Sequence, residues 1–136
     1  ICDVCTRVED AIAMSGLKGA LVTKLLKLRK NNMQWREYRK ELIQENKWRA
    51  VRYGLTGKLI DFGKKKEIDA KKLIFELLTF VDDVVDDLGI RDEVSHIHQI
   101  LTEGTSAERQ LRVFKEEKSA KAVVDMLIKD TLLGIE

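Results

Sequence analysis

The sequence predicts an all-α chain of about six helices, interrupted by one short hairpin or loop insert. Proline is absent from the 136 residues, and Gly (8) and aromatic residues (4 Phe, 2 Trp, 2 Tyr) are few, which argues against a turn-rich β-protein. Apolar residues recur at helical spacing over most of the length. Hydrophobic residues make up 44% and charged residues 35% of the chain, which excludes a disordered protein. No window approaches the roughly 18 uncharged apolar residues of a membrane span.

Two long helices and the insert account for the first half. The first helix is expected over Thr6–Arg29, and the second runs from about Gln34 to Tyr53 and stops at Gly54. Three glycines lie in or beside Leu55–Asp69, which is best explained as a short hairpin or ordered loop. Leu59, Ile60 and Phe62 are expected to be its apolar contacts.

Four further helices follow. One is expected over Ala70–Leu88 and ends at Gly89, and three shorter ones cover Asp92–Thr102, Ser106–Glu117 and Ser119–Leu133. The serines that open the last two are taken as N-terminal caps. No fixed-period repeat is present, which argues against a solenoid.

Charge, cysteine content and the first residue each restrict the type of protein. Residues 1–58 carry a net charge of +7 and residues 59–136 one of −5, so the first half could face an anion.

The two cysteines, Cys2 and Cys5, give no disulfide framework, which indicates a reducing compartment and hence the cytoplasm. Zinc needs four ligands, and the other candidates, His96 and His98, lie over 90 residues away. We therefore interpret the two cysteines as buried thiols and expect no metal site. The sequence opens on Ile1 with no secretory signal, so we expect a piece of a longer protein.

The run Asp82-Asp83-Val84-Val85-Asp86-Asp87 resembles the aspartate-rich Mg²⁺ motif of isoprenoid synthases. A second such motif and a much larger helical bundle are lacking. A solvated helix face is therefore the favoured interpretation. The stripe expected to be buried on that helix is Leu73, Leu77, Phe80, Val84 and Leu88.

The second helix offers the best candidate for anion binding. Arg49 and Arg52 lie one turn apart, and Asn46 precedes Arg49 by three residues, so all three share a face that could hold a phosphate or carboxylate. Aromatic residues between basic ones would also suit nucleic acid, through phosphate pairing and base stacking. A structural helix with solvated arginines is the other alternative.

Four stretches, in order, resemble the type 2 glutamate–cysteine ligases and their carboxylate–amine ligase relatives. Asn46-Lys-Trp-Arg-Ala-Val-Arg-Tyr-Gly54 resembles the family's Asn-x-Trp-Arg-Ala-x-Arg-Tyr-Gly signature. Ile1-Cys-Asp-x-x-Thr-Arg7 resembles the end of its Glu-x-Arg strand, and Leu59-Ile-Asp61 a hairpin after the signature. Gly104-Thr-Ser-Ala-Glu-Arg-Gln110 resembles its Gly-Thr-Ser-Ala-Asp-Arg-Gln turn, with Glu for Asp.

The resemblance implies that residues 1–136 are the C-terminal helical segment of a longer catalytic domain with a glutamine-synthetase-like α+β fold. It implies an ATP-dependent ligase that joins a carboxylate, such as glutamate, to cysteine or another amine through an acyl phosphate. ATP and Mg²⁺ would bind in the intact protein and not to this piece, which we expect to be inactive alone. Its partners would be the missing N-terminal sheet and small-molecule substrates.

Carried over by position, Asp3, Thr6 and Arg7 would line the substrate end of the site. Asn46, Arg49, Arg52 and Tyr53 would be a structural or anion-contacting (ATP-contacting) face, and the sequence does not separate these roles. No catalytic residue is assigned. The alternative is a small helical module that binds nucleic acid through its basic half or assembles into a homo-oligomer through exposed apolar surface.

Overall fold

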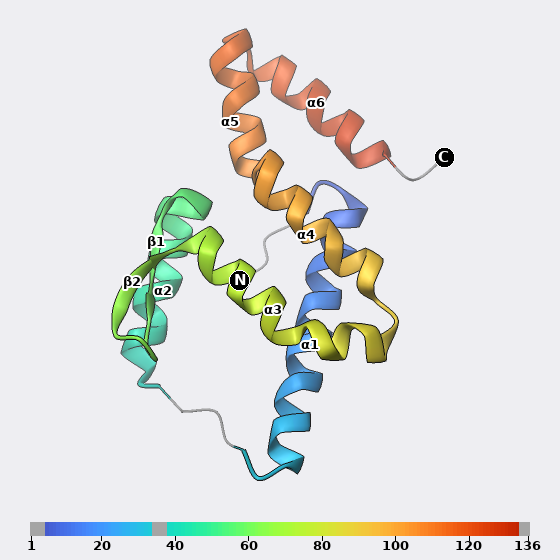
Figure 1. The fold of residues 1–136 in the computed structure, drawn as a ribbon. Helices are drawn as coiled ribbons and strands as arrows, with labels where there is room; N and C mark the ends of the chain where they lie inside the picture. The colour runs from blue at the N-terminus through green and yellow to red at the C-terminus, as the bar shows by residue number, and fades with distance from the viewer. Residues whose placement is uncertain (1–4, 34–37, 134–136) are drawn as a thin grey trace. The chain divides into compact units, whose positions relative to one another are not determined.

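The computed structural model describes residues 5–33 and 38–133 (Figure 1). It divides into two compact units, and the first helix contributes to both. Unit 1 comprises residues 1–16 and 90–136, and unit 2 comprises residues 17–89. No helix in the described part of the chain is both long and apolar enough to cross a membrane.

The expected helical architecture is confirmed. The helices are α1 (Val8–Lys30), α2 (Lys40–Tyr53), α3 (Ala70–Leu88), α4 (Arg91–Glu103), α5 (Ser106–Glu117) and α6 (Ala120–Leu132). A short 3₁₀ turn, η1 (Gly54–Thr56), follows α2. The insert is a hairpin of β1 (Lys58–Asp61) and β2 (Lys66–Asp69), paired antiparallel with Leu59 opposite Ile68.

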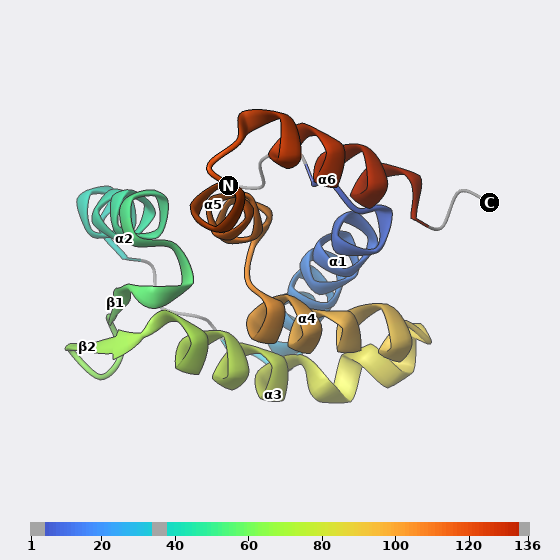
Figure 2. The same cartoon turned by 90° about the horizontal axis from the view of Figure 1, so that it is seen from above.

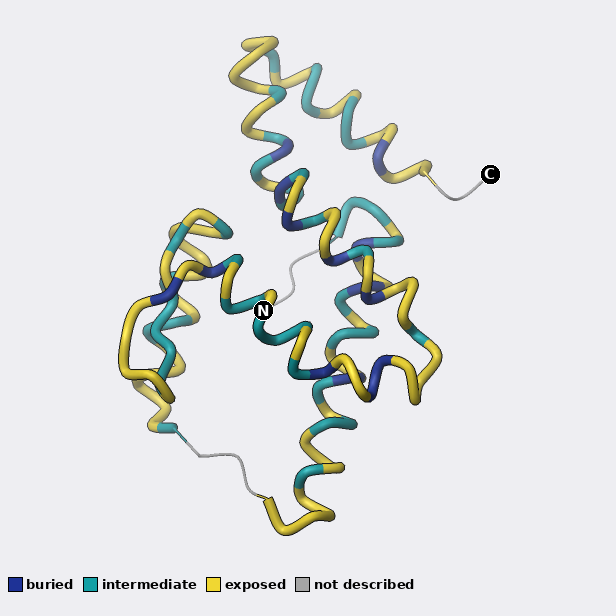
Figure 3. Tube along the Cα trace, in the orientation of Figure 1, coloured by how far each residue is buried: buried dark blue, intermediate teal, exposed yellow. Residues whose placement is uncertain are grey.

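In unit 2 the hairpin packs between α2 and α3. Of its side chains, Ile68 is the buried one, whereas Leu59, Ile60 and Phe62, expected to be its apolar contacts, are half-buried. In Figure 3 the buried positions of α3 lie at its start and in its second half, and α2 contains none. The small size of the buried residues is notable, because the largest fully buried side chains are Val81 and Val84.

The start of α2 differs from the expected one. Residues 34–37 lie outside the described part, but Tyr38 and Arg39 are described and are not helical. Arg39 has an extended backbone (φ −60°, ψ 141°). The Tyr38 ring packs against Phe62 of the hairpin, with ring centroids 4.9 Å apart. Tyr38 makes this contact from outside the helix, where we expected it to be helical.

The buried stripe of α3 is also displaced from the expected one. Val84 is buried as expected, but Leu88 is 43% exposed, while Val81 and Val85 are buried. Leu88 is the last residue of the helix before the left-handed Gly89 (φ 66°), where the chain leaves the packed face. The four aspartates of the run at 82–87 are exposed, as the favoured interpretation requires.

Unit 1 combines the first turns of α1 with α4, α5 and α6. Helices α1 and α4 are in ordinary van der Waals contact near Gly16, since a Cβ there would lie 3.4 Å from Val94 and 3.7 Å from Ile90. Helices α5 and α6 meet in a V-shaped helical hairpin (Figures 1 and 2). The turn between them is set by Lys118 in a left-handed conformation (φ 52°) and by Ser119, whose hydroxyl caps α6.

Candidate functional site

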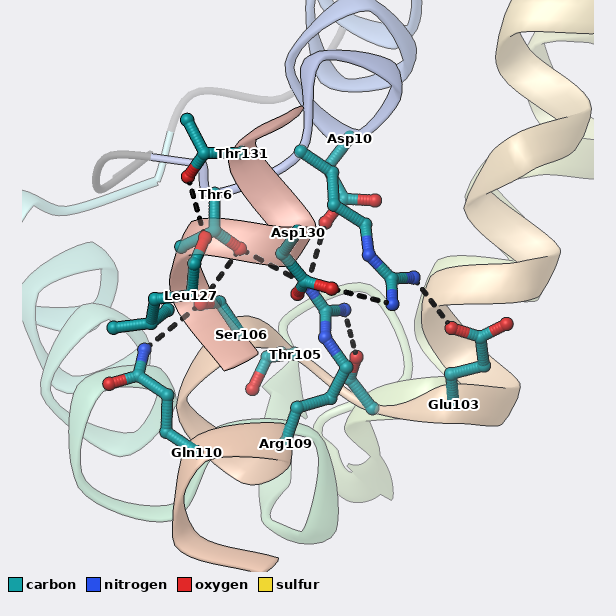
Figure 4. Close-up of polar contacts among 12 residues, drawn as sticks. Thr6, Asp10, Glu103, Thr105, Ser106, Arg109, Gln110, Leu127, Asp130 and Thr131 are labelled. Atoms are coloured by element: carbon teal, nitrogen blue, oxygen red, sulfur yellow. Dashed lines mark hydrogen bonds and ion pairs between the residues drawn. The ribbon is translucent and has the colours of Figure 1, made fainter. Parts of the chain in front are cut away.

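Two sets of residues singled out in the sequence lie in defined polar networks, one in each unit. The network in unit 1 joins the start of α1 to α4, α5 and α6, and we call it the arginine core. Figure 4 shows the side chains of its labelled members, among them Thr6, Asp10, Arg109 and Asp130, turned toward one another. Its members are Thr6, Arg7, Asp10, His96, Glu103, Ser106, Arg109 and Asp130.

The arginine core is built on the turn between α4 and α5. Gly104 has φ 96°, and a Cβ there would lie 3.1 Å from Oε2 and 3.2 Å from Cβ of Glu108, so this position requires glycine. Thr105 and Glu108 form a complete capping box at the start of α5. The cap expected at Ser106 is therefore wrong by one residue. Since Thr105 caps the helix, the Ser106 hydroxyl is available to accept a hydrogen bond from Thr6 at 3.2 Å.

Arg109 is the buried centre of this network. Its side chain is 9% exposed. Its Nη2 donates to Oδ2 of Asp10 and to the Thr6 hydroxyl, each at 3.3 Å, and Nη1 donates to the Gly104 carbonyl at 3.1 Å. Oδ2 of Asp130 lies 3.4 Å from Nη2 as well. One guanidinium thus ties the start of α1, the end of α4 and the last turn of α6 together.

Arg7 joins the same helices from the other side. Its Nη1 donates to Oε2 of Glu103 at 2.7 Å and its Nη2 to Oδ1 of Asp130 at 3.2 Å. Burial acts to lower the pKa of Arg7, but the hydrogen bonds to Glu103 and Asp130 outweigh it, so the pKa is raised. The hydrogen bond from Gln99 and then that from Arg7 lower the pKa of Glu103. The pair is therefore charged over the whole physiological range.

His96 completes the arginine core. Its Nε2 lies 2.8 Å from Oδ1 of Asp10, which is buried. His98, two residues along α4, is exposed, in line with the expectation that the two histidines have no joint role. No group of three or more His, Cys, Asp or Glu that could hold a metal ion occurs among residues 5–33 and 38–133.

The second network, in unit 2, joins α2 to the hairpin. The Asn46 side chain donates to the Ile60 carbonyl at 2.8 Å and accepts from the Ile60 N–H at 2.7 Å. Asn46 therefore pairs with β1 as a neighbouring strand would. Gly54 ends α2 with φ 56°, and a Cβ on Gly57 would lie 2.5 Å from Cβ of Tyr53.

Arg49 binds the hairpin from the same helix. Its Nη1 lies 2.7 Å from Oε1 of Glu67 on β2, and its Nε lies 2.8 Å from Oε1 of Glu45. The hydrogen bonds to Glu67 and Glu45 raise the pKa of Arg49. The Arg49 guanidinium, which we expected to bind an anion, is therefore already paired with two carboxylates of the same chain.

Arg52 and Tyr53 differ from their neighbours on α2. The Arg52 side chain is exposed and makes no hydrogen bond or ion pair with any other residue that the structure describes. Tyr53 is 51% exposed, and its ring meets Trp48 edge-on at 5.8 Å. The structure therefore links Asn46 and Arg49 through the hairpin and leaves Arg52 outside that contact.

The predicted substrate-lining residues are brought together in part. Thr6 and Arg7 both belong to the arginine core, whereas Asp3 lies outside the described residues. Sequence reasoning missed Asp10, Glu103 and Asp130 as partners of the arginines. The Gly104–Gln110 motif was the available signal, since Arg109 lies within it.

A cavity of about 610 Å³ in unit 2 is a weaker candidate. Its lining is mainly leucine and aromatic side chains from α1, α3 and the hairpin. The polar groups at its rim are occupied, because Lys64 lies 2.6 Å from Glu76 and 3.4 Å from Asp61.

Comparison with known proteins agrees with these motifs. The family described as glutamate-cysteine ligase family 2 matches residues 1–126. A protein of Herpetosiphon aurantiacus is 53% identical over 135 residues, and one of Chloroflexus aggregans is 51% identical over 135. Both carry the name "Putative glutamate--cysteine ligase 2", and each match covers 99% of this chain.

The chain spans 35% of the length of these relatives. No solved structure matches it. The motifs that build the two networks, Asn46–Gly54 and Gly104–Gln110, lie within the matched residues. The chain therefore belongs to glutamate-cysteine ligase family 2.

Proposed function

We propose that this chain is part of an ATP-dependent carboxylate–amine ligase that joins glutamate to cysteine or a related amine. The carboxylate would be activated as an acyl phosphate, and the amine would then displace the phosphate. ATP and Mg²⁺ would bind in the intact protein, and the chain alone would bind neither and would be inactive. We also propose a cytoplasmic location, since two cysteines make no disulfide framework.

The observation that carries the proposal is the arginine core. Arg7 and Arg109 are held by buried carboxylates next to the Thr6 hydroxyl, and both arginines lie within segments that resemble the ligases. A guanidinium in a fixed position suits a carboxylate or phosphoryl oxygen, because charge-assisted, planar hydrogen bonds orient such groups. In this proposal Thr6 and Arg7 line the substrate end of the site, as the resemblance implies.

The contribution of α2 is proposed to be mainly structural. Asn46 and Arg49 fix the hairpin, and Arg52 with Tyr53 remains available for an anion such as a nucleotide phosphate. The nucleic-acid alternative has less support, because Glu45 and Glu67 neutralise Arg49. A homo-oligomer through exposed apolar residues remains an expectation of the sequence.

The test is an assay of the full-length protein that carries this sequence. ADP release is measured with ATP and Mg²⁺, with glutamate and cysteine added singly and together. The proposal predicts ADP release that requires both amino acids, and a product that contains one of each. Two results would contradict the proposal. One is ADP release at the same rate with and without the amino acids, and the other is no ADP release with any combination of amino acids and amines.

A further inference from the structure

We propose that Arg7 is a carboxylate-binding position whose place is held by Glu103, and that the carboxylate of an amino acid displaces Glu103 when it binds. This inference rests on the proposed function, since it takes the ligand to be an amino-acid substrate such as glutamate. It starts from the two carboxylates on Arg7, which differ in how firmly they are held.

Asp130 is the fixed partner of Arg7. Its side chain is 8% exposed, and Arg109 approaches its second oxygen to 3.4 Å. Glu103 is the exposed partner, with a side chain 39% exposed, and among the residues described its other side-chain hydrogen bond comes from Gln99. A ligand arriving from solvent would therefore meet Glu103 and leave Asp130 in place.

The position of Glu103 in α4 makes it easier to displace. It is the last residue of that helix, where the negative end of the helix dipole disfavours a carboxylate. Its backbone is held independently, because Arg112 Nη2 donates to the Glu103 carbonyl at 2.7 Å. The side chain can thus swing away while the end of the helix stays in place. A carboxylate kept at the unfavourable end of a helix dipole is typical of a functional position.

The charges of the arginine core also point to Glu103 as the carboxylate that a ligand would replace. The charges of the two guanidinium groups, Arg7 and Arg109, are matched by the two buried carboxylates, Asp10 and Asp130. Glu103 is the additional negative charge, and a substrate carboxylate in its place would leave the balance unchanged. Arg7 also keeps one donor, Nε, without a hydrogen-bond partner among the residues described.

The experiment is a calorimetric titration of the full-length protein that carries this sequence with L-glutamate. The variants are Glu103→Gln, the double variant Glu103→Gln with Arg7→Gln, and Glu117→Gln as the matched control on exposed α5 surface. Glu103→Gln should bind glutamate about tenfold or more tightly than the wild type, since a competing charge-assisted bond is removed. The control should match the wild type, and the double variant should lose the gain. Glutarate, which has no amine, should reproduce the effect.

Equal affinity of Glu103→Gln and the wild type, or no response in either, would overturn the inference. If Glu103→Gln loosens the fold, Gln99→Ala provides the same test more mildly, since it frees Glu103 without removing its charge, and the gain should be smaller but present. Failure here would leave the ligase assay of the full-length protein unaffected. A gain in binding without ligation would keep the carboxylate position and refute the proposed function.

Discussion

Nη2 of Arg109 donates a hydrogen bond to Oδ2 of Asp10 over 3.3 Å, between side chains that are each 9% exposed and 99 residues apart in the sequence. Asp10 lies in the first turn of α1 and Arg109 in α5. A buried pair of this kind adds little net stability while intact, but it is costly to break, because the remaining charge loses its partner away from water.

Arg109→Gln should therefore destabilise unit 1 strongly. The substitution leaves Asp10 and Asp130 without their shared cation, and the expected loss is about 3–5 kcal/mol of unfolding free energy. Urea unfolding of the purified chain, followed by circular dichroism, measures it. Lys115→Gln, on the exposed part of the same helix, is the matched control and should change stability by less than about 0.5 kcal/mol. A loss no larger than that of the control would show that the pair does not hold the helices.

Two glycine substitutions should act in opposite directions. Gly104→Ala places a methyl group at φ 96° and within 3.2 Å of Glu108, so we expect a loss of about 1–3 kcal/mol. Gly19→Ala lies inside α1, and beyond its own helix backbone and chain neighbours nothing lies within 4 Å of the new methyl, so we expect a gain of about 0.5–1 kcal/mol. Thermal unfolding of both variants beside the wild type gives the comparison. The same sign for both would contradict the conformations described for these positions.

Asn46→Ala should weaken the attachment of the hairpin to α2. It removes both hydrogen bonds to the Ile60 backbone, and the expected cost is about 1–3 kcal/mol. Hydrogen exchange of the Ile60 amide should be faster in the variant than in the wild type. Gln44→Ala, an exposed change on the same helix, should leave that rate unaltered. An unchanged rate in Asn46→Ala would mean that the side chain does not pair with β1.

The contribution of Asp83 to stability should depend on pH and salt. Hydrogen bonds from Lys24 and then Lys27 lower the pKa of Asp83 to about 2. Because the folded pKa lies below the unfolded one, the stabilisation is full above about pH 5 and is lost as the pH falls through about 2. The stability difference between wild type and Asp83→Asn should shrink over that interval. It should also shrink in 1 M salt, since the Debye length there is about 3 Å. A difference that stays constant from pH 6 to pH 2 would refute the ion pair.

Local signals predicted much of the fold. The bounds of α3 and α5 agree with expectation, because the left-handed Gly89 ends α3 and a polar turn opens α5. The start of α2 was wrong because the contact of Tyr38 with Phe62 is made across 24 positions and has no helical period. The cap of α5 was misplaced because Thr105 and Ser106 are adjacent hydroxyl residues, and only the reach of Glu108 decides between them.

The candidate site was predictable only in part. The arginine of the Gly104–Gln110 turn could be read as part of a motif, but its partners Asp10 and Asp130 stand in sequence contexts that give no signal of burial. Arg7 and Glu103 are 96 residues apart, so their pairing depends on how α1 and α4 pack. By contrast, the exposed aspartate run at 82–87 followed directly from its helical spacing.

The most direct test of the arginine core is a double-mutant cycle on Asp10 and Arg109. Asp10→Asn, Arg109→Gln and the double variant are compared with the wild type by urea unfolding. If the two side chains pair in the buried core of unit 1, their coupling free energy should be at least about 1 kcal/mol, and the double variant should be less destabilised than the sum of the single changes. A coupling within about 0.3 kcal/mol of zero would contradict the pairing on which the core, and the position of Arg7 beside it, depend.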